Sequence, residues 1–128
     1  MTYPAIPPRS ARVLKEVGKE RARQDQKWGE QNHPDGTADD RRMLADVTLP
    51  TWGTVCYLAR ERTDHLNAAG EATYLDIMLE EVAEAFSESD PTRLRAELIQ
   101  VAAVAVQWVE AIDRRRVTQA AEQLGEVQ

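Results

Sequence analysis

The sequence predicts an all-α protein, and three observations support this class. Apolar residues recur at the three-to-four-residue spacing of a helix, as Val13 and Val17 do near the N-terminus. Residues that start or end helices separate these segments, with Gly70 and Pro91 as the clearest examples. No segment alternates apolar and polar residues with a period of two, so no sheet is expected.

The N-terminal part is expected to hold one helix followed by a long loop. Residues 1–9 contain three prolines and predict a loose tail. The first helix is predicted from Ser10, acting as its N-cap, to Trp28. Glycine, asparagine and proline then crowd together, which predicts a loop that extends toward Leu49 and could hold a short helix over 41–47.

Two further helices are expected to form a hairpin. Pro50 suits the first turn of a helix over 50–69, with Thr48 as a possible cap. Gly70 is typical of a C-cap, and it predicts that the next helix runs over 71–89.

The last predicted helix begins at Pro91, with Asp90 as its cap, and runs to at least Asp113. Residues 116–128 are polar and are expected either to extend this helix or to fray as a tail. The chain is long enough for one domain, predicted over 10–115.

Charge and cysteine content limit the classes of function. A net charge of -6 argues against a surface that coats nucleic acid, although a metal ion can still bring a single nucleotide among carboxylates. The lone Cys56 cannot form an internal disulfide, which favours a reducing, cytoplasmic location. No apolar run reaches the roughly 20 residues of a membrane span, so no membrane contact is expected.

An acidic helix face is the first candidate site. Helical spacing of about 100° per residue places Glu80, Glu81 and Glu84 on one face of their helix. Such a face is ordinarily a solvated surface. The next helix differs, because ten of the twelve residues over 98–109 are apolar and predict a buried helix, with Glu97 at its N-terminal end.

The short turn between these helices predicts that they are antiparallel neighbours. Counting outward from Asp90 places Glu97 and Gln100 level with residues 80–84. Converging carboxylates repel one another unless a cation lies between them. Mg²⁺ prefers such oxygen ligands, and Mn²⁺ could replace it.

At this point the sequence resembles the MazG-like all-α nucleoside triphosphate pyrophosphohydrolases, whose metal motif is E-E-x-x-E followed by E-x-x-D. Residues 80–84 match the first half. The second half begins at Glu97, but Gln100 stands where the family usually has aspartate. A literal E-x-x-D occurs at Glu110 to Asp113, roughly 20 Å further along the helix and too far for the same ion. Residues 23–36 also resemble the leader of a bacterial and phage branch of this family.

The resemblance implies a four-helix bundle completed by a homodimer or homotetramer, and Mg²⁺-dependent hydrolysis of a nucleoside triphosphate to monophosphate and pyrophosphate. It implies Glu81, Glu84, Glu97 and the weaker ligand Gln100 at the metal, and Glu80 with Glu81 in catalysis. The expected substrate contacts are Lys27, Trp28, Asn32, His33, Arg93 and Arg95.

Other interpretations remain for the protein and for single residues. Gln100 is compatible with a protein that binds a nucleotide or a protein partner without hydrolysing it, and a purely structural helical bundle is a further alternative. Trp28 is expected either to stack on a base or to cover the core beneath its loop. Cys56, Trp52 and Trp108 are interpreted as packing residues.

Overall fold

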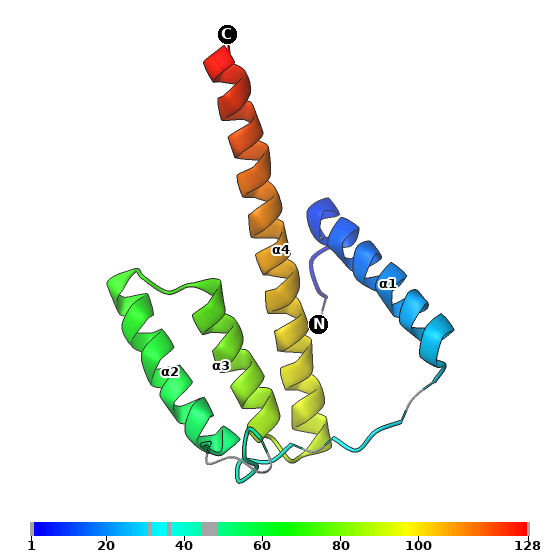
Figure 1. The fold of residues 1–128 in the computed structure, drawn as a ribbon, viewed down its shortest axis with the longest axis vertical. Helices are drawn as coiled ribbons and strands as arrows, with labels where there is room; N and C mark the ends of the chain where they lie inside the picture. The colour runs from blue at the N-terminus through cyan, green and yellow to red at the C-terminus, as the bar shows by residue number, and fades with distance from the viewer. Residues whose placement is uncertain (1, 31, 36, 45–48, 128) are drawn as a thin grey trace. The chain divides into compact units, whose positions relative to one another are not determined.

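The computed structural model describes residues 2–30, 32–35, 37–44 and 49–127. Four helices follow one another along the chain (Figure 1): α1 (Pro8–Trp28), α2 (Trp52–Ala69), α3 (Tyr74–Ser87) and α4 (Pro91–Val127). Within these described residues there is no strand, and the only bridge is an isolated antiparallel pair between Arg42 and Thr51. The predicted all-α class is confirmed.

The chain divides into two compact units. Unit 1 comprises residues 1–33 and 106–128, and unit 2 comprises residues 34–105, so that α4 contributes to both. The expected single domain over 10–115 stays a prediction.

Helix α1 begins earlier than predicted. Pro7 is its N-cap residue and makes no side-chain cap bond, and Pro8 occupies the first turn, where a missing N–H costs no hydrogen bond. Ser10 is therefore not the N-cap. Its hydroxyl instead donates to Oε1 of Glu110 at 2.5 Å, and Arg9 lies 3.7 Å from the other oxygen of that carboxylate.

Helix α2 begins at Trp52, and its cap is Thr51, whose hydroxyl accepts a bond from the backbone N–H of Thr54 at 3.3 Å. Pro50 is thus not in the first turn, because a hydroxyl at position 51 satisfies the free N–H groups of the helix start. The cap predicted at Thr48 lies outside the described residues.

The loop before α2 is not helical where it is described. Residues 41–44 of the predicted short helix form a bridge and bends, and residues 45–47 lie outside the described residues. The loop is held to the end of α3, because Ala38 N–H donates to the carbonyl of Phe86 at 3.0 Å and Thr37 donates to that of Glu88 at 2.5 Å.

Helices α2 and α3 lie side by side as a hairpin (Figure 1). Gly70 adopts the left-handed conformation, with φ 72°, and confirms the predicted C-cap. Helix α3 begins at Tyr74 rather than Glu71, because Thr73 and Asp76 form a capping box that defines the helix start.

The hairpin is tied a second time at Asp76. Arg62 of α2 donates from Nε to Oδ1 of the Asp76 carboxylate at 2.9 Å. The hydroxyl of Thr63 donates to the backbone carbonyl of Asp76 at 3.3 Å. Hydrogen bonds from Thr73, and then the bond from Arg62, lower the pKa of Asp76. One acidic residue therefore serves both the start of α3 and its contact with α2.

Helix α4 begins as predicted. The carboxylate of Asp90 accepts the N–H of Arg93 at 3.0 Å, and Pro91 is the first helical residue. The helix then continues past Asp113 to Val127, so the polar C-terminal residues extend it.

Few side chains are buried in unit 2, and those buried are small or medium in size. They include Cys56, as predicted, together with Ala59, Ala83, Ala85, Leu94 and Val104. Among the described residues, no large side chain is completely inaccessible to solvent.

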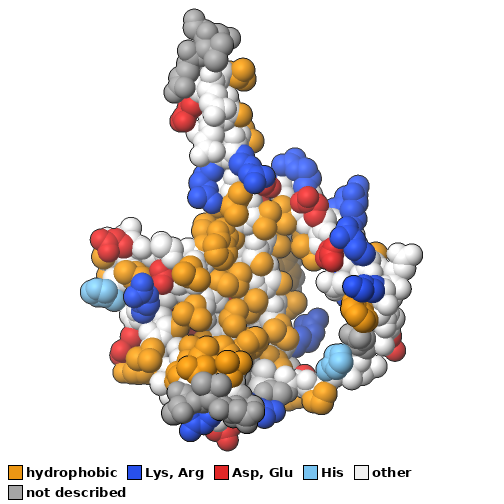
Figure 2. Space-filling view, viewed as in Figure 1, with side chains coloured by type: hydrophobic (Ala, Val, Ile, Leu, Met, Phe, Trp, Pro, Cys, Tyr) orange, Lys and Arg blue, Asp and Glu red, His pale blue; other side chains and the backbone are white. Residues whose placement is uncertain are grey.

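The predicted burial of the apolar stretch over 98–109 is correct for Val104 but wrong for the exposed residues of this stretch. Leu98 is 46% exposed and Ile99 is 55% exposed. Figure 2 shows hydrophobic side chains gathered at the surface over α3 and the first part of α4. The reason is that, among the described residues of unit 2, no further helix is present to cover this side of α4.

Across the described residues, none of the helices combines the length and the apolar character that a membrane crossing requires.

Candidate metal centre

Three glutamates from two helices meet within unit 2. Glu81 and Glu84 come from α3, and Glu97 comes from the first part of α4. One carboxylate oxygen of each lies within 4.8 Å of the other two, and all three residues are half-buried. The turn over residues 88–90 makes the helices antiparallel, which brings Glu97 to the level of the α3 glutamates. The structure therefore brings together three of the four carboxylates whose convergence the sequence predicted, and leaves Glu80 outside the group.

Glu81 has a buried carboxylate oxygen without a partner in the described part of the chain. Its Oε2 is inaccessible to solvent and has no hydrogen-bond partner among the described residues. Burial raises the pKa of this carboxyl, and the charges of Glu84, Glu97 and Glu80 raise it further. A buried carboxylate oxygen without a donor is costly, so this atom requires a proton or a cation.

Glu97 of α4 lies against the charge of Glu84 on α3. Burial raises the pKa of Glu97, followed by the charge of Glu84 and a hydrogen bond with it. A cation between these carboxylates would offset their repulsion.

The three residues fit a hard divalent cation. The group contains only carboxylates, with neither histidine nor cysteine, and its half-buried position leaves room for water ligands. Oxygen ligands with several retained waters are the preference of Mg²⁺, and Mn²⁺ accepts the same set. The orphaned Oε2 of Glu81 is the observation that a bound cation would explain.

Glu80 lies beside this group rather than in it. Burial raises the pKa of its carboxyl, and the charges of Glu84 and Asp64 add to that effect. A carboxylate with a raised pKa is a better proton acceptor near neutral pH. Glu80 is thus suited to orient or deprotonate a water next to the three ligands.

Arg60 of α2 is a site residue that the sequence analysis missed. Its Nε donates to Oε1 of Glu84 at 3.1 Å. The same outward count that paired α3 with α4 would have found it, because Arg60 and Glu84 are nearly equidistant from the turn between α2 and α3.

The other predicted residues of α4 are exposed at its N-terminal end. Gln100 is exposed one turn beyond Glu97. Arg93 lies one turn before Glu97, about 40° away around the helix, whereas Arg95 is about 160° away. Helical geometry therefore favours Arg93 over Arg95 as a phosphate contact.

The predicted contacts from the leader belong to unit 1. Within the structure Trp28 is 61% exposed, and Lys27 lies 4.8 Å from the centre of its ring. Trp28 and His33 line a pocket of about 470 Å³, and Asn32 is exposed next to them. An exposed aromatic ring beside a pocket is suited to stacking, so this interpretation of Trp28 remains.

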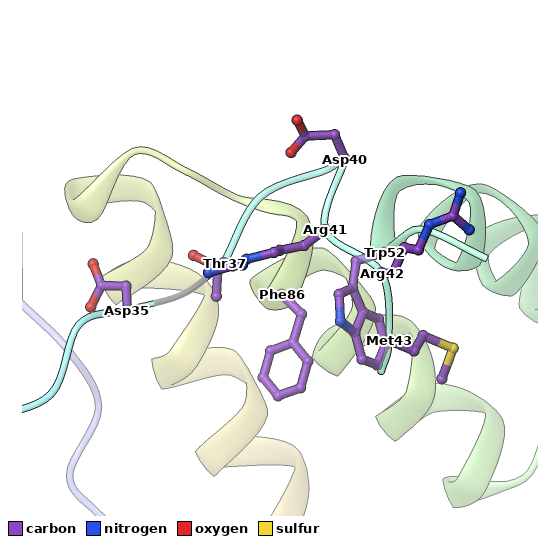
Figure 3. A pocket seen from close by; sticks show the side chains of 8 residues that line it. All are labelled: Asp35, Thr37, Asp40, Arg41, Arg42, Met43, Trp52 and Phe86. Carbon is purple, nitrogen blue, oxygen red and sulfur yellow. The ribbon is translucent and has the colours of Figure 1, made fainter. Parts of the chain in front are cut away.

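Unit 2 also contains a pocket of about 480 Å³ at the loop before α2 (Figure 3). Trp52 packs edge to face against Phe86, with ring centres 4.9 Å apart, which confirms Trp52 as a packing residue. In Figure 3 the side chain of Arg41 extends from the loop toward Thr37. The full lining is Asp35, Thr37, Asp40, Arg41, Arg42, Met43, Trp52 and Phe86.

Comparison of the chain with protein-family models, with curated proteins and with solved structures yields no significant match.

Proposed function

We propose that this chain is a Mg²⁺-dependent nucleoside triphosphate pyrophosphohydrolase with a MazG-like helical bundle. The observation that carries the proposal is the meeting of Glu81, Glu84 and Glu97 within 4.8 Å. It is supported by the order of the acidic motif along α3 and α4 and by the buried oxygen of Glu81 that has no partner. Both features are expected of a site built around a divalent ion.

The reaction is the addition of water to a nucleoside triphosphate, which gives a nucleoside monophosphate and pyrophosphate. When bound, the divalent ion polarises phosphoryl oxygens and offsets the charge that develops on them. Glu81, Glu84 and Glu97 hold this ion, and Gln100 contributes a neutral oxygen at the edge of the site. Glu80 accepts a proton from the attacking water, a role suited to its raised pKa.

The proposal includes an oligomer, at least a homodimer and alternatively a homotetramer. Its support is the exposed apolar surface of unit 2, to which Leu58, Leu75, Leu98 and Ile99 contribute. Surfaces of this kind commonly mark protein interfaces. A cytoplasmic location is part of the same proposal, because the free Cys56 suits a reducing compartment.

A product assay tests the function. The purified chain is incubated with Mg²⁺ and a panel of ribonucleoside and deoxyribonucleoside triphosphates, and pyrophosphate and monophosphate are measured. We expect both products from at least one member of the panel, with turnover lost in Glu81→Gln and Glu84→Gln.

The departure at Gln100 provides a second arm of the assay. Restoring the family aspartate with Gln100→Asp adds a charged ligand and is expected to increase turnover at limiting Mg²⁺. Nucleotide binding without product over the whole panel, in both the natural chain and this variant, would favour the alternative of a binding protein that has lost hydrolysis.

A further inference from the structure

Arg60 is a cationic side chain that forms an ion pair with one of the three glutamates, Glu84. Its Nε lies 3.1 Å from Oε1 of Glu84. The two partners differ in their surroundings, since the side chain of Arg60 is 56% exposed and that of Glu84 is 19% exposed. The carboxylate is therefore held in place, whereas the guanidinium approaches from solvent and can leave without disturbing the fold.

The charge of Arg60 acts on more than one acid. Besides its bond with Glu84, it interacts favourably with the charged forms of Glu80 and Glu97. Three carboxylates around one point repel one another, and in the ion-free protein a guanidinium offsets part of that repulsion. A divalent ion placed between the same oxygens would compete directly with Arg60 for Glu84.

We propose that Arg60 is a positioning residue that stands against Glu84 in the ion-free protein, releases this carboxylate when a divalent ion binds, and then holds a phosphate oxygen of the substrate. This inference rests on the proposed function, since it names a residue of the same site. The guanidinium is suited to both partners, because its planar donors match carboxylate and phosphate oxygens alike.

The first step predicts that removing Arg60 strengthens metal binding. An exposed ion pair contributes little to stability. Its loss frees Glu84 to bind the metal, and this alone corresponds to at most about a fivefold gain in metal affinity. The loss of a positive charge next to the cation acts in the same direction. For Arg60→Gln we expect the Kd for Mn²⁺ to fall about two- to fivefold.

The measurement is a calorimetric titration of the full chain with Mn²⁺ in the absence of nucleotide. The matched control is Arg23→Gln, which removes the same charge from another exposed ion pair, between Arg23 and Glu20 in unit 1. The control should bind Mn²⁺ as the natural chain does. Equal or weaker Mn²⁺ binding by Arg60→Gln would overturn the first step, because Arg60 would then either have no effect on metal binding or support it.

The second step predicts the opposite sign for phosphate. Inorganic pyrophosphate is titrated into each protein in saturating Mg²⁺. We expect Arg60→Gln to bind pyrophosphate about tenfold more weakly than the natural chain. The affinity of Arg60→Lys should lie between those of the natural chain and Arg60→Gln, because lysine keeps the charge but lacks the planar donors of arginine. Pyrophosphate affinity equal to that of the natural chain would overturn this step even if Mn²⁺ binding is tighter.

The two experiments separate this inference from the proposed function. Neither requires turnover, so both changes in affinity could be found in a protein that hydrolyses no nucleotide, in which case the inference stands and the function fails. Hydrolysis that is normal in Arg60→Gln, with unchanged Mn²⁺ and pyrophosphate affinities, would leave the function standing and refute the role of Arg60.

Discussion

At the scale of single residues, the charges of Glu81, Glu84 and Glu97 destabilise the folded protein when no ion is bound. Burial raises the pKa of both Glu81 and Glu97, and mutual repulsion raises it further. Near neutral pH the ionised group therefore opposes folding unless a cation is bound. Sites of this kind exchange stability for function, which predicts opposite effects of one substitution on the ion-free and ion-bound protein.

Glu97→Gln should stabilise the ion-free protein and weaken metal binding. The amide removes a charge and can still donate a hydrogen bond to Glu84, so we expect a gain of about 1 kcal/mol or less in unfolding free energy at pH 7.5. The Kd for Mn²⁺ should rise about tenfold or more. Thermal unfolding with and without Mn²⁺ measures both effects.

The matched control is Glu16→Gln, which removes a charge from an exposed position of α1. It should change neither the ion-free melting temperature nor the Mn²⁺ shift. A Glu97→Gln protein that is less stable than the natural chain without Mn²⁺ would contradict the claim that the glutamate charges destabilise the ion-free protein.

The pH dependence of stability follows from the same raised pKa values. A carboxyl whose pKa is raised in the folded state stabilises that state when the pH is below the ordinary pKa of the group. This contribution is lost as the pH rises through the pKa of the folded state. Metal binding requires the ionised form and so grows over the same range.

The stabilisation by Mn²⁺, measured as the difference in melting temperature with and without the ion, should therefore increase from pH 5 to pH 7.5. Scanning fluorimetry at fixed Mn²⁺ measures it. A difference independent of pH would show that the carboxyls with raised pKa do not bind the ion.

At the scale of elements, the α2–α3 hairpin holds the site in place. Its capping box at Thr73 and Asp76 determines where α3 begins, and hence which face carries Glu81 and Glu84. Arg60 and Arg62 of α2 connect it to opposite ends of α3, at Glu84 and Asp76 respectively. Stability of the hairpin and geometry of the site are thus coupled through α3.

Thr73→Ala should destabilise the protein by about 1 kcal/mol, the usual effect of losing an N-cap side chain. Chemical denaturation measures it. The comparison is Thr118→Ala, an exposed threonine within α4 whose hydroxyl bonds only to the carbonyl of Arg114. An effect at Thr73 no larger than that at Thr118 would mean that the capping box is not what holds the start of α3.

The sequence predicted the order of the helices better than their starts. The start at Pro91 and the end before Gly70 were correct, since proline and glycine act through their own backbone restrictions. The starts at Ser10 and Glu71 were wrong, because Pro8 and Thr73 compete for the same role at short range. Local patterns do not determine which of two nearby capping residues is used.

The candidate site was predictable to the extent that it depends on helix pairing. The short turn before Pro91 was sufficient to bring Glu97 to the α3 glutamates. Arg60 was not predicted, because an acidic motif does not indicate a basic partner, although the distance of Arg60 from the turn between α2 and α3 matches that of Glu84. The exposure of Leu98 could not be predicted, since an apolar helix does not reveal whether its own chain or a partner covers it.

At the scale of the whole molecule, a small core accompanies a large exposed apolar surface. The buried side chains of unit 2 are small or medium in size, whereas Leu58, Leu75 and Ile99 are more than half exposed. A surface of this kind is better stabilised in an assembly than in water.

We predict that the chain forms at least a dimer at micromolar concentration. Light scattering coupled to size exclusion measures its mass. Ile99→Glu places a charge on the exposed surface of α4 and should shift the mass toward a monomer, whereas Val117→Glu, at a more exposed position in unit 1, should not. A monomeric mass for the natural chain would contradict this prediction.

The central claim is that acid groups of α3 and α4 hold one divalent ion. Its most direct test is a crystal grown with Mn²⁺ and measured at a wavelength where manganese scatters anomalously. The account predicts one strong anomalous peak bonded to oxygens of Glu81, Glu84 and Glu97. A crystal containing millimolar Mn²⁺ with no peak between these carboxylates, or with its only peak elsewhere, would contradict the claim.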